Sequence, residues 1–433
     1  MLGYRKRDPN ILVAKRGKKE EHKDTNRSDR SDQTSSERMY QMLCDNNTAK
    51  LLGLEDVIVE EVYDNETEIH VNIRLPRKEH ICPECGERTN SIHDYRRQTV
   101  RDIPAFGKKT FLHLLKRRYR CRKCDKRFAE INPFLPRYHQ VTGRLITKII
   151  DDFRRVRPAT QIAEENGVSV TSSLRYFGLV NYSCRSLPEV LSIDEFKGNA
   201  GGEKFQSILT DPKNKVILDI LPNRKSVSLQ QYFRKFKDRD RVKAVVMDMN
   251  RAYLEVARTC FPNAVIVIDK YHVSRQAVWA FENVRKAEQK KFHSDRRKYF
   301  KRSRSLLNKH PSQLTEEETD EVAVMLRSSK RLAKAYLLKN KFQEFMRSRS
   351  SDEARRRLSD WSMLAHSYNI PEFDNCFRAV NNWSKYILNS FDCPYTNGYT
   401  EGCNNKTKVL KRVCYGVRNF ERFRNRILHA SAA

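Results

Sequence analysis

Short apolar runs separated by polar turns follow one another through the middle of the chain. Five of these runs have the length and the valine, isoleucine and leucine content of buried strands, at residues 190–196, 203–210, 215–221, 242–247 and 264–268. Between and after them, apolar residues recur at helical spacing, at 226–237, at 251–259 and from about 271. Three strands in hairpin order, followed by alternating helices and strands, predict a mixed sheet in an α/β domain.

Two of the predicted strands end in an aspartate, Asp194 and Asp248. A carboxylate at the end of a buried strand contributes little to packing, but it is well placed to hold a divalent cation. The strand order is that of a ribonuclease-H-like fold, in which the first and fourth strands lie side by side. We therefore expect the two aspartates to face each other at one edge of the sheet and to share metal ions.

A third carboxylate is expected further along the chain, and there are two candidates. Asp269 ends the last predicted strand, and Glu401 lies near the start of a predicted helix that Asn397 could cap. Polar residues at spacings of three and four share one face of that helix, namely Asn397, Glu401, Asn405, Lys408 and Arg412, whereas Val409, Leu410 and Val413 are expected to point into the domain. The alternative is that Glu401 only caps the helix and pairs with Lys408.

An earlier part of the chain, 51–75, alternates apolar and polar residues as strands do, and two C-x-x-C pairs follow it. The four thiols, Cys82, Cys85, Cys121 and Cys124, are the ligand set of a structural zinc ribbon, and strands at 99–103 and 110–119 would form a hairpin between the pairs. A redox dithiol or an accidental pairing is the alternative. Basic residues crowd the second pair, among them Arg118 and Arg122, so the ribbon is also expected to contact phosphate.

After the ribbon, apolar residues at 143–155 predict an amphipathic helix, and 158–177 has the pattern of two short helices. Thr160 could cap the first of them, Gly167 could make the turn, and the second would start at Ser169. This is a helix-turn-helix layout, in which the start of the second helix contacts base edges, here through Ser169, Thr171, Ser172 and Arg175. An ordinary αα-hairpin is the alternative.

The pattern divides the chain into five parts. These are a polar, disordered extension at 1–38, a zinc-ribbon domain at 39–132, a helix-turn-helix domain at 133–182, a catalytic domain at 183–272 and 396–433, and a basic helical insertion at 273–395. The three tryptophans, Trp279, Trp361 and Trp383, are expected in the core rather than at a nucleic acid.

Charge narrows the class of partner. With 85 lysines and arginines against 54 acidic residues, the formal net charge is +31, which is typical of a protein that binds a polyanion. A ribosomal-type protein or a protein bound to an anionic membrane surface is the alternative. No apolar run is long enough to span a membrane, and the first residues lack the apolar core of a signal peptide. Double-stranded DNA in a reducing, intracellular compartment is the expected setting.

Several motifs together resemble the bacterial insertion-sequence transposases of the ISL-three type, from about residue 51 to the C-terminus. They are C-P-E-C and C-R-K-C, the segment 160–177, S-I-D-E-F at 192–196, V-M-D-M at 246–249, V-I-D-K-Y-H-V at 267–273 and N-G-Y-T-E-G-C-N-N-K at 397–406. The resemblance implies a DDE transposase whose ribonuclease-H-like core is interrupted by a helical insertion. It also implies that Asp194, Asp248 and Glu401 bind Mg²⁺ or Mn²⁺, with Asp269, His272, Asn397 and Lys408 in support.

The activity implied is binding of the terminal repeats of an insertion sequence, followed by DNA cleavage and strand transfer. Two metal ions about 3.5–4 Å apart activate the attacking oxygen and stabilise the leaving oxygen. Water frees a 3′-OH at the element end, and this hydroxyl then attacks target DNA. We expect a homodimer in the synaptic complex and a cytoplasmic, nucleoid-associated protein. The alternatives are a non-catalytic zinc-ribbon and helix-turn-helix regulator, or a nuclease or resolvase of the same fold that cuts without joining.

Overall fold

The computed structural model describes residues 48–54 and 56–432, and these fall into two compact units. The first unit holds 48–63, 70–98 and 113–130, and the second holds 64–69, 99–112 and 131–432. The extension expected at 1–38 lies outside the described residues. None of the described helices combines the length and the apolar character that crossing a membrane requires.

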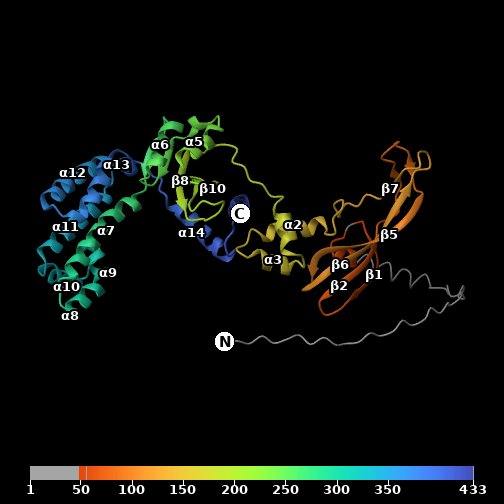
Figure 1. Ribbon diagram of the computed structural model, residues 1–433, viewed down its shortest axis with the longest axis horizontal. Helices are drawn as coiled ribbons and strands as arrows, with labels where there is room; N and C mark the ends of the chain where they lie inside the picture. The colour runs from red at the N-terminus through yellow and green to blue at the C-terminus, as the bar shows by residue number, and fades with distance from the viewer. Residues whose placement is uncertain (1–47, 55, 433) are drawn as a thin grey trace, which may run out of the picture. The chain divides into compact units, whose positions relative to one another are not determined.

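The N-terminal part of the chain forms a sheet of five strands (Figure 1). Its strands are β1 (Ile58–Asp64), β2 (Glu68–Arg74), β5 (Ile92–Ala105), β6 (Lys108–Arg120) and β7 (Arg127–Ala129), in the order β1-β2-β6-β5 with β7 paired to β6. A separate two-stranded ribbon pairs β3 (His80–Ile81) with β4 (Arg88–Thr89). The hairpin expected between the C-x-x-C pairs is therefore present as β5 and β6, and both strands are longer than predicted.

Three short helices follow the first sheet, namely α2 (Gly143–Asp152), α3 (Ala159–Glu165) and α4 (Val170–Phe177). The first ends earlier than predicted, because the chain turns at Phe153 and a proline follows at Pro158. The prediction that Thr160 caps α3 is wrong: Pro158 occupies that position, because its fixed φ suits a residue that enters a helix. Gly167 makes the turn into α4 with φ +62°, as expected of glycine.

The second sheet has the predicted strands, with β8 (Val190–Phe196), β9 (Gln206–Asp211), β10 (Val216–Leu221), β11 (Ala244–Met247) and β12 (Val265–Ile268) in the order β10-β9-β8-β11-β12. The first three strands pair antiparallel, whereas β11 pairs parallel with both β8 and β12. The expectation that the first and fourth strands are neighbours is confirmed. In the register of the parallel pairs, Met247 is opposite both Ile193 and Ile268.

Helices cover both faces of this sheet. Alternate residues of β8 explain how: Leu191 and Ile193 pack on one side with α5 (Ser226–Arg234) and α6 (Arg251–Cys260). On the other side, Phe196 packs with residues of α14 (Gly398–Val413) and α15 (Phe420–Ser431). Because side chains alternate along a strand, Ser192 and Asp194 share the face that α14 covers.

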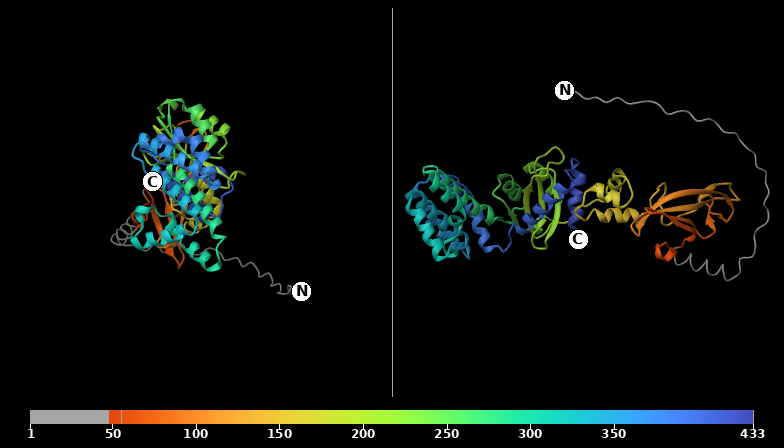
Figure 2. Two further views of the ribbon diagram at one scale, coloured as in Figure 1. Left: turned by 90° about the vertical axis from the view of Figure 1, so that its left-hand side faces the viewer. Right: turned by 90° about the horizontal axis from the view of Figure 1, so that it is seen from below.

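Helices between β12 and α14 form a bundle, drawn from green to blue in Figure 2, and its core is continuous with the core on the α5 and α6 side of the second sheet. They are α7 (Lys270–Gln289), α8 (Ser294–Arg302), α9 (Arg304–Asn308), α10 (Glu316–Arg327), α11 (Lys330–Met346), α12 (Ser351–Tyr368) and α13 (Asp374–Asp392), with short 3-10 turns at 311–313 and 371–373. A further 3-10 turn, at 239–241, precedes β11. Trp361 and Trp383 are buried, as expected, but Trp279 is 51% exposed, so its prediction as a core residue is wrong.

The C-terminal helix α15 joins the three-helix segment to the second sheet. Arg426 is buried and donates hydrogen bonds to the carbonyls of Phe153, Arg155 and Arg157, which follow α2. His429, on the same helix, contacts the hydroxyl of Tyr182 at 2.6 Å.

Replacing Arg426 with leucine is expected to cost about 3 kcal/mol or more of folding free energy. The change removes the buried guanidinium that donates to the carbonyls of Phe153, Arg155 and Arg157, and each polar group left buried without a partner costs about 1–3 kcal/mol. Arg422→Leu is the matched control, because Arg422 is an exposed arginine on the same helix. Thermal unfolding and hydrogen exchange of residues 153–158 would measure both variants. Equal effects of the two substitutions would contradict this role for Arg426.

Candidate active site

Three aspartates lie near the carboxyl ends of three neighbouring parallel strands. Asp194 follows Ile193 in β8, Asp248 follows the end of β11, and Asp269 follows the end of β12. Because Ile193, Met247 and Ile268 are in register, the three carboxylates lie side by side at one end of the sheet. The placement of Asp194 beside Asp248 therefore agrees with the prediction, and Asp269 extends the row.

His272 lies in the first turn of α7 and contacts two of these carboxylates. Its Nδ1 is 2.7 Å from Oδ1 of Asp248 and 3.2 Å from Oδ2 of Asp269. These hydrogen bonds raise the pKa of His272 to about 10, so the imidazole is protonated and neutralises part of the acidic row. The ligand atoms of the three residues also lie within 4.8 Å of one another, so they could hold one metal ion if His272 gave up this proton. In the described part of the chain, Asp194 and Glu401 are outside this group.

The side chain of Asp194 is buried, whereas that of Asp248 is half-buried. Its Oδ1 accepts a hydrogen bond from the N–H of Glu195 at 2.7 Å, and its Oδ2 accepts one from Nδ2 of Asn404 at 2.8 Å. Burial, with the negative charge of Asp248 acting in the same direction, raises the pKa of Asp194 to about 7. A cation bound at this end of the sheet would therefore favour the ionised carboxylate.

Asn404 is a site residue that the sequence analysis missed. It is buried on α14, and in the described part of the chain its Oδ1 lacks a hydrogen-bond partner. An unpaired buried amide oxygen beside a carboxylate is a donor atom that suits a hard cation or its bound water.

A chain of hydroxyl groups fixes the start of α14 on the sheet. Thr400 donates to Oγ of Ser192 at 2.9 Å, and Ser192 donates to Oδ1 of Asn397. Since the hydroxyl of Thr400 is already used as a donor, Thr210 donates to Thr400, at 2.7 Å. All four residues are buried. Asn397 is the N-cap residue of α14, as predicted, but its side chain accepts from β8 and makes no capping hydrogen bond to its own helix.

The orientation of α14 differs from the prediction in one further respect. Val409, expected to point into the domain, is 50% exposed, because Thr400, Cys403, Asn404 and Thr407 occupy the buried face together with Leu410. Glu401 and Lys408 are exposed. Glu401 lies three residues before Asn404, and Lys408 lies four residues after it. Both therefore lie along the same side of the helix as Asn404, the residue that contacts Asp194.

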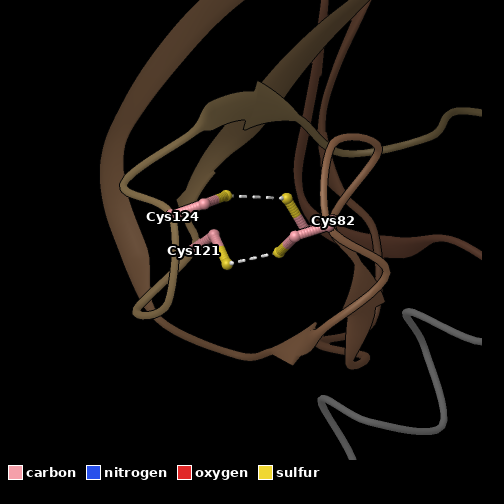
Figure 3. A group of neighbouring side chains, drawn as sticks. Cys82, Cys121 and Cys124 are labelled. Carbon is pink, nitrogen blue, oxygen red and sulfur yellow. Dashed lines mark hydrogen bonds between the residues drawn. The ribbon is translucent and has the colours of Figure 1, made fainter.

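The four predicted zinc ligands converge at the base of the β5–β6 hairpin (Figure 3). Sγ of Cys82 is 3.5 Å from Sγ of Cys124, and Sγ of Cys85 is 3.5 Å from that of Cys121. Cys82 and Cys121 are buried. Four sulfurs within 4.8 Å of one another fit the closed tetrahedral set of a structural zinc ion, as predicted.

The basic residues beside the ribbon are not equivalent. Arg118 forms a partly exposed ion pair with Asp94 at 3.1 Å, and Arg122 is exposed. Arg117 is buried against Glu130 and donates to the carbonyl of Leu75, so it supports the sheet and is not available to phosphate.

Three of the residues expected to contact bases, Ser169, Thr171 and Ser172, lie at the start of α4, whereas Arg175 lies in its last turn. Ser169 is the N-cap, and its Oγ accepts from the N–H of Ser172 at 3.1 Å. Ser169, Thr171 and Arg175 are exposed, and Ser172 is half-buried. The guanidinium of Arg175 lies over the ring of Tyr176. The structure thus leaves this end of the helix accessible.

Comparisons with known proteins agree with these features. The ISL3 model, described as a transposase, matches residues 191–427, more than half of the chain, and a model of the zinc-finger of transposase IS204/IS1001/IS1096/IS1165 matches residues 78–124. The transposase for insertion sequence element IS1001 of Bordetella parapertussis is 25% identical over 82% of this chain and 89% of its own length.

Two further relatives match shorter stretches. The transposase for insertion sequence element IS1557 of Mycobacterium tuberculosis is 28% identical over 29% of this chain and 28% of its own length. A Lactococcus lactis protein named ATP-dependent protease is 33% identical over 26% of this chain and 34% of its own length. The family models cover both the zinc ribbon and the sheet that carries the aspartates, and the chain belongs to the ISL3 family of transposases.

Proposed function

We propose that this chain is a DDE transposase with a ribonuclease-H-like core that cleaves the ends of its own insertion sequence and joins them to target DNA. The observation that carries the proposal is the row of Asp194, Asp248 and Asp269, which follow the paired residues Ile193, Met247 and Ile268 of three parallel strands. A transposase needs carboxylates grouped at one site, and the match to the ISL3 transposases covers this sheet.

The catalytic acids proposed are Asp194, Asp248 and Glu401. Support for Glu401 comes from α14, since the hydroxyl chain from Thr210 to Asn397 fixes the start of the helix on the sheet. Asn404, one turn after Glu401, then contacts Asp194 directly. In this proposal Asp269 holds His272, and Lys408 lies on the same stripe as Glu401 to meet a phosphate.

The residues present fit Mg²⁺ or Mn²⁺, because carboxylate and amide oxygens are the ligands that these hard ions prefer. Such an ion supplies charge stabilisation to the attacking and leaving oxygens of the phosphodiester. Asp194 and Asp248 would hold it from the sheet and Glu401 from α14. Asn404 orients the Asp194 carboxylate, and protonated His272 limits the repulsion between Asp248 and Asp269.

Recognition of the element ends is assigned to the N-terminal segments. Helices α3 and α4 have the layout of a helix-turn-helix, and Ser169, Thr171, Ser172 and Arg175 lie where such a motif contacts base edges. Arg118 and Arg122 beside the zinc ribbon would contact phosphates. Two ends must be held together for joining, so the active species proposed is a homodimer on double-stranded DNA.

The alternative is a non-catalytic regulator that binds DNA through the zinc ribbon and α4. The presence of all the proposed catalytic acids favours the enzyme, because a site that only packs the fold has no need of several neighbouring carboxylates whose charges repel.

The experiment uses purified, zinc-loaded protein, Mg²⁺ and labelled DNA that carries both flanks of its own gene. Nicks with 3′-OH ends at inverted repeats, followed by joining to a second DNA, are the expected result. Specific binding with no nicks would support the regulator. Nicks with no joining would support a nuclease or resolvase.

Asn404→Ala tests the contact to Asp194 within the same assay. We expect cleavage to fall by about 10–100-fold, the usual effect of removing a partner that orients a metal ligand. Asn381→Ala is the matched control, since Asn381 is an exposed asparagine on α13, away from the residues proposed for the site. A loss that raised Mg²⁺ recovers would show weakened metal binding, whereas full activity of Asn404→Ala would remove Asn404 from the site.

A further inference from the structure

Helix α7 presents a stripe of aromatic and basic side chains that packing of the bundle does not explain. Tyr271 and Trp279 are 50% and 51% exposed. The guanidinium of Arg275 lies between them, 5.4 Å from the ring centre of Tyr271 and 4.4 Å from that of Trp279. The stripe continues with the exposed Lys286 on the same helix and with the exposed Lys290 at its C-terminal cap.

The stripe begins at the acidic row. Asp269 is the N-cap of α7, and the ring of Tyr271 lies edge-on to that of His272 with 5.6 Å between the ring centres. At 1.5 Å per residue, Trp279 lies about 15 Å along the helix axis from Asp269. That distance matches about four stacked nucleotides at 3.4 Å each. A DNA strand held at the acidic row would therefore be within reach of both rings.

The chemistry of the stripe matches unpaired nucleobases better than it matches a duplex. Exposed aromatic rings stack on bases that have left a duplex, and interleaved cations hold the phosphates between them. In the described part of the chain, no carboxylate forms an ion pair with Arg275, so its charge is available to a phosphate. A net charge of +31 favours a nucleic-acid partner over an acidic surface of a second copy of this chain.

The geometry points to a base-stacking site for single-stranded DNA on α7, formed by Tyr271, Arg275 and Trp279. The site stacks the DNA bases that become unpaired next to the scissile phosphate. It thereby holds the DNA strand that extends from the acidic row along α7. This inference rests on the proposed function for its biological setting, but the stacking itself requires no cleavage.

The test measures binding of the zinc-loaded full chain to a short oligothymidylate and to an abasic oligonucleotide of equal length, without added Mg²⁺. We expect the oligothymidylate to bind more tightly and to quench tryptophan fluorescence, because Trp361 and Trp383 are buried and Trp279 is not. Trp279→Ala should weaken oligothymidylate binding by about tenfold or more, as loss of one stacked base does. It should leave abasic binding unchanged.

Two variants keep the result interpretable. Trp279→Phe should restore most of the affinity without the fluorescence signal. Met363→Ala, which truncates a 64% exposed apolar side chain on α12, should bind like the unchanged protein. Equal affinity for the two oligonucleotides, or normal oligothymidylate binding by Trp279→Ala, would overturn the site. A change in sedimentation of Trp279→Ala without a change in DNA binding would instead assign the stripe to contacts between copies.

Failure of the stacking site and failure of the proposed function are separate outcomes. Cleavage at the element ends with no preference for bases over abasic DNA would refute only the stacking site. Stacking without cleavage would refute only the transposase activity.

Discussion

Replacing Asp194 or Asp248 with asparagine, or Glu401 with glutamine, is expected to lower DNA cleavage by about a thousandfold or more. Each change removes one carboxylate that would hold the cation, and charge stabilisation by that cation contributes several kcal/mol to the reaction barrier. Binding to the element ends should persist, because the residues proposed for recognition lie on α4 and beside the zinc ribbon. Rates of 3′-OH formation and gel-shift affinities would measure the two effects separately.

Controls for this prediction come from neighbouring acids. Glu421→Gln changes an exposed glutamate in the first turn of α15 and should leave cleavage unaffected. Asp269→Asn should reduce cleavage less than Glu401→Gln, because Asp269 is assigned to holding His272. The reverse order would make Asp269 the third acid. Loss of end binding in Asp194→Asn, Asp248→Asn or Glu401→Gln would show damage to the fold rather than to the chemistry.

Cys82→Ser or Cys121→Ser is expected to release the zinc ion and to unfold the two knuckles of the ribbon. Zinc bound by such sites contributes about 10–16 kcal/mol in small peptides, which is comparable to the whole stability of a typical domain. Both thiols are buried. A serine hydroxyl in either place would be a poor zinc ligand, and it would also be shielded from water. Native mass spectrometry would measure the zinc content, and hydrogen exchange would follow residues 80–89 and 119–129.

Cys393→Ser is the matched control, because this half-buried thiol lies in the second unit, outside the cysteine cluster. It should retain zinc and normal exchange in the ribbon. Chelation of the unchanged protein should reproduce the exchange pattern of Cys82→Ser. Full protection of the ribbon after zinc removal would mean that the surrounding sheet, with buried pairs such as Arg117 and Glu130, is sufficient.

The sequence was sufficient to predict the second sheet and the adjacency of Asp194 and Asp248. Strands buried on both faces are continuous apolar runs, and the polar residue that ends each run marks the sheet edge. The order of strands and helices then restricted the topology. The zinc ligands were predictable for a similar reason, since each pair of thiols is only two residues apart.

The face of α14 was not predictable from the same kind of pattern. Its buried side is mostly polar, because Asn397, Thr400 and Asn404 bond to groups on β8. Periodicity analysis assumes that apolar residues face the core, so it placed Val409 inside and overlooked Asn404. The partner residues are about 200 positions away in sequence, and only the folded sheet brings them to the helix.

Trp279 shows a different limit of sequence reasoning. A large aromatic residue in a basic helix is expected to be buried. The buried side of α7, however, is already formed by Val273, Ala277 and Phe281. Trp279 lies on the opposite side of the helix. Which side faces the bundle depends on the positions of α11 and α13, which the local pattern does not contain.

The insertion of about 130 residues between β12 and α14 sets an order of events during synthesis. At about 5–20 residues per second, a ribosome completes β12 roughly 6–25 seconds before α14 begins to emerge. During that interval the nascent chain exposes one face of the sheet and carries Asp194, Asp248 and Asp269 without Glu401 or Asn404. Neither α14 nor the Arg426 contact of α15 can form until then. A nascent chain therefore acquires its full proposed set of acids only after the whole insertion has been translated.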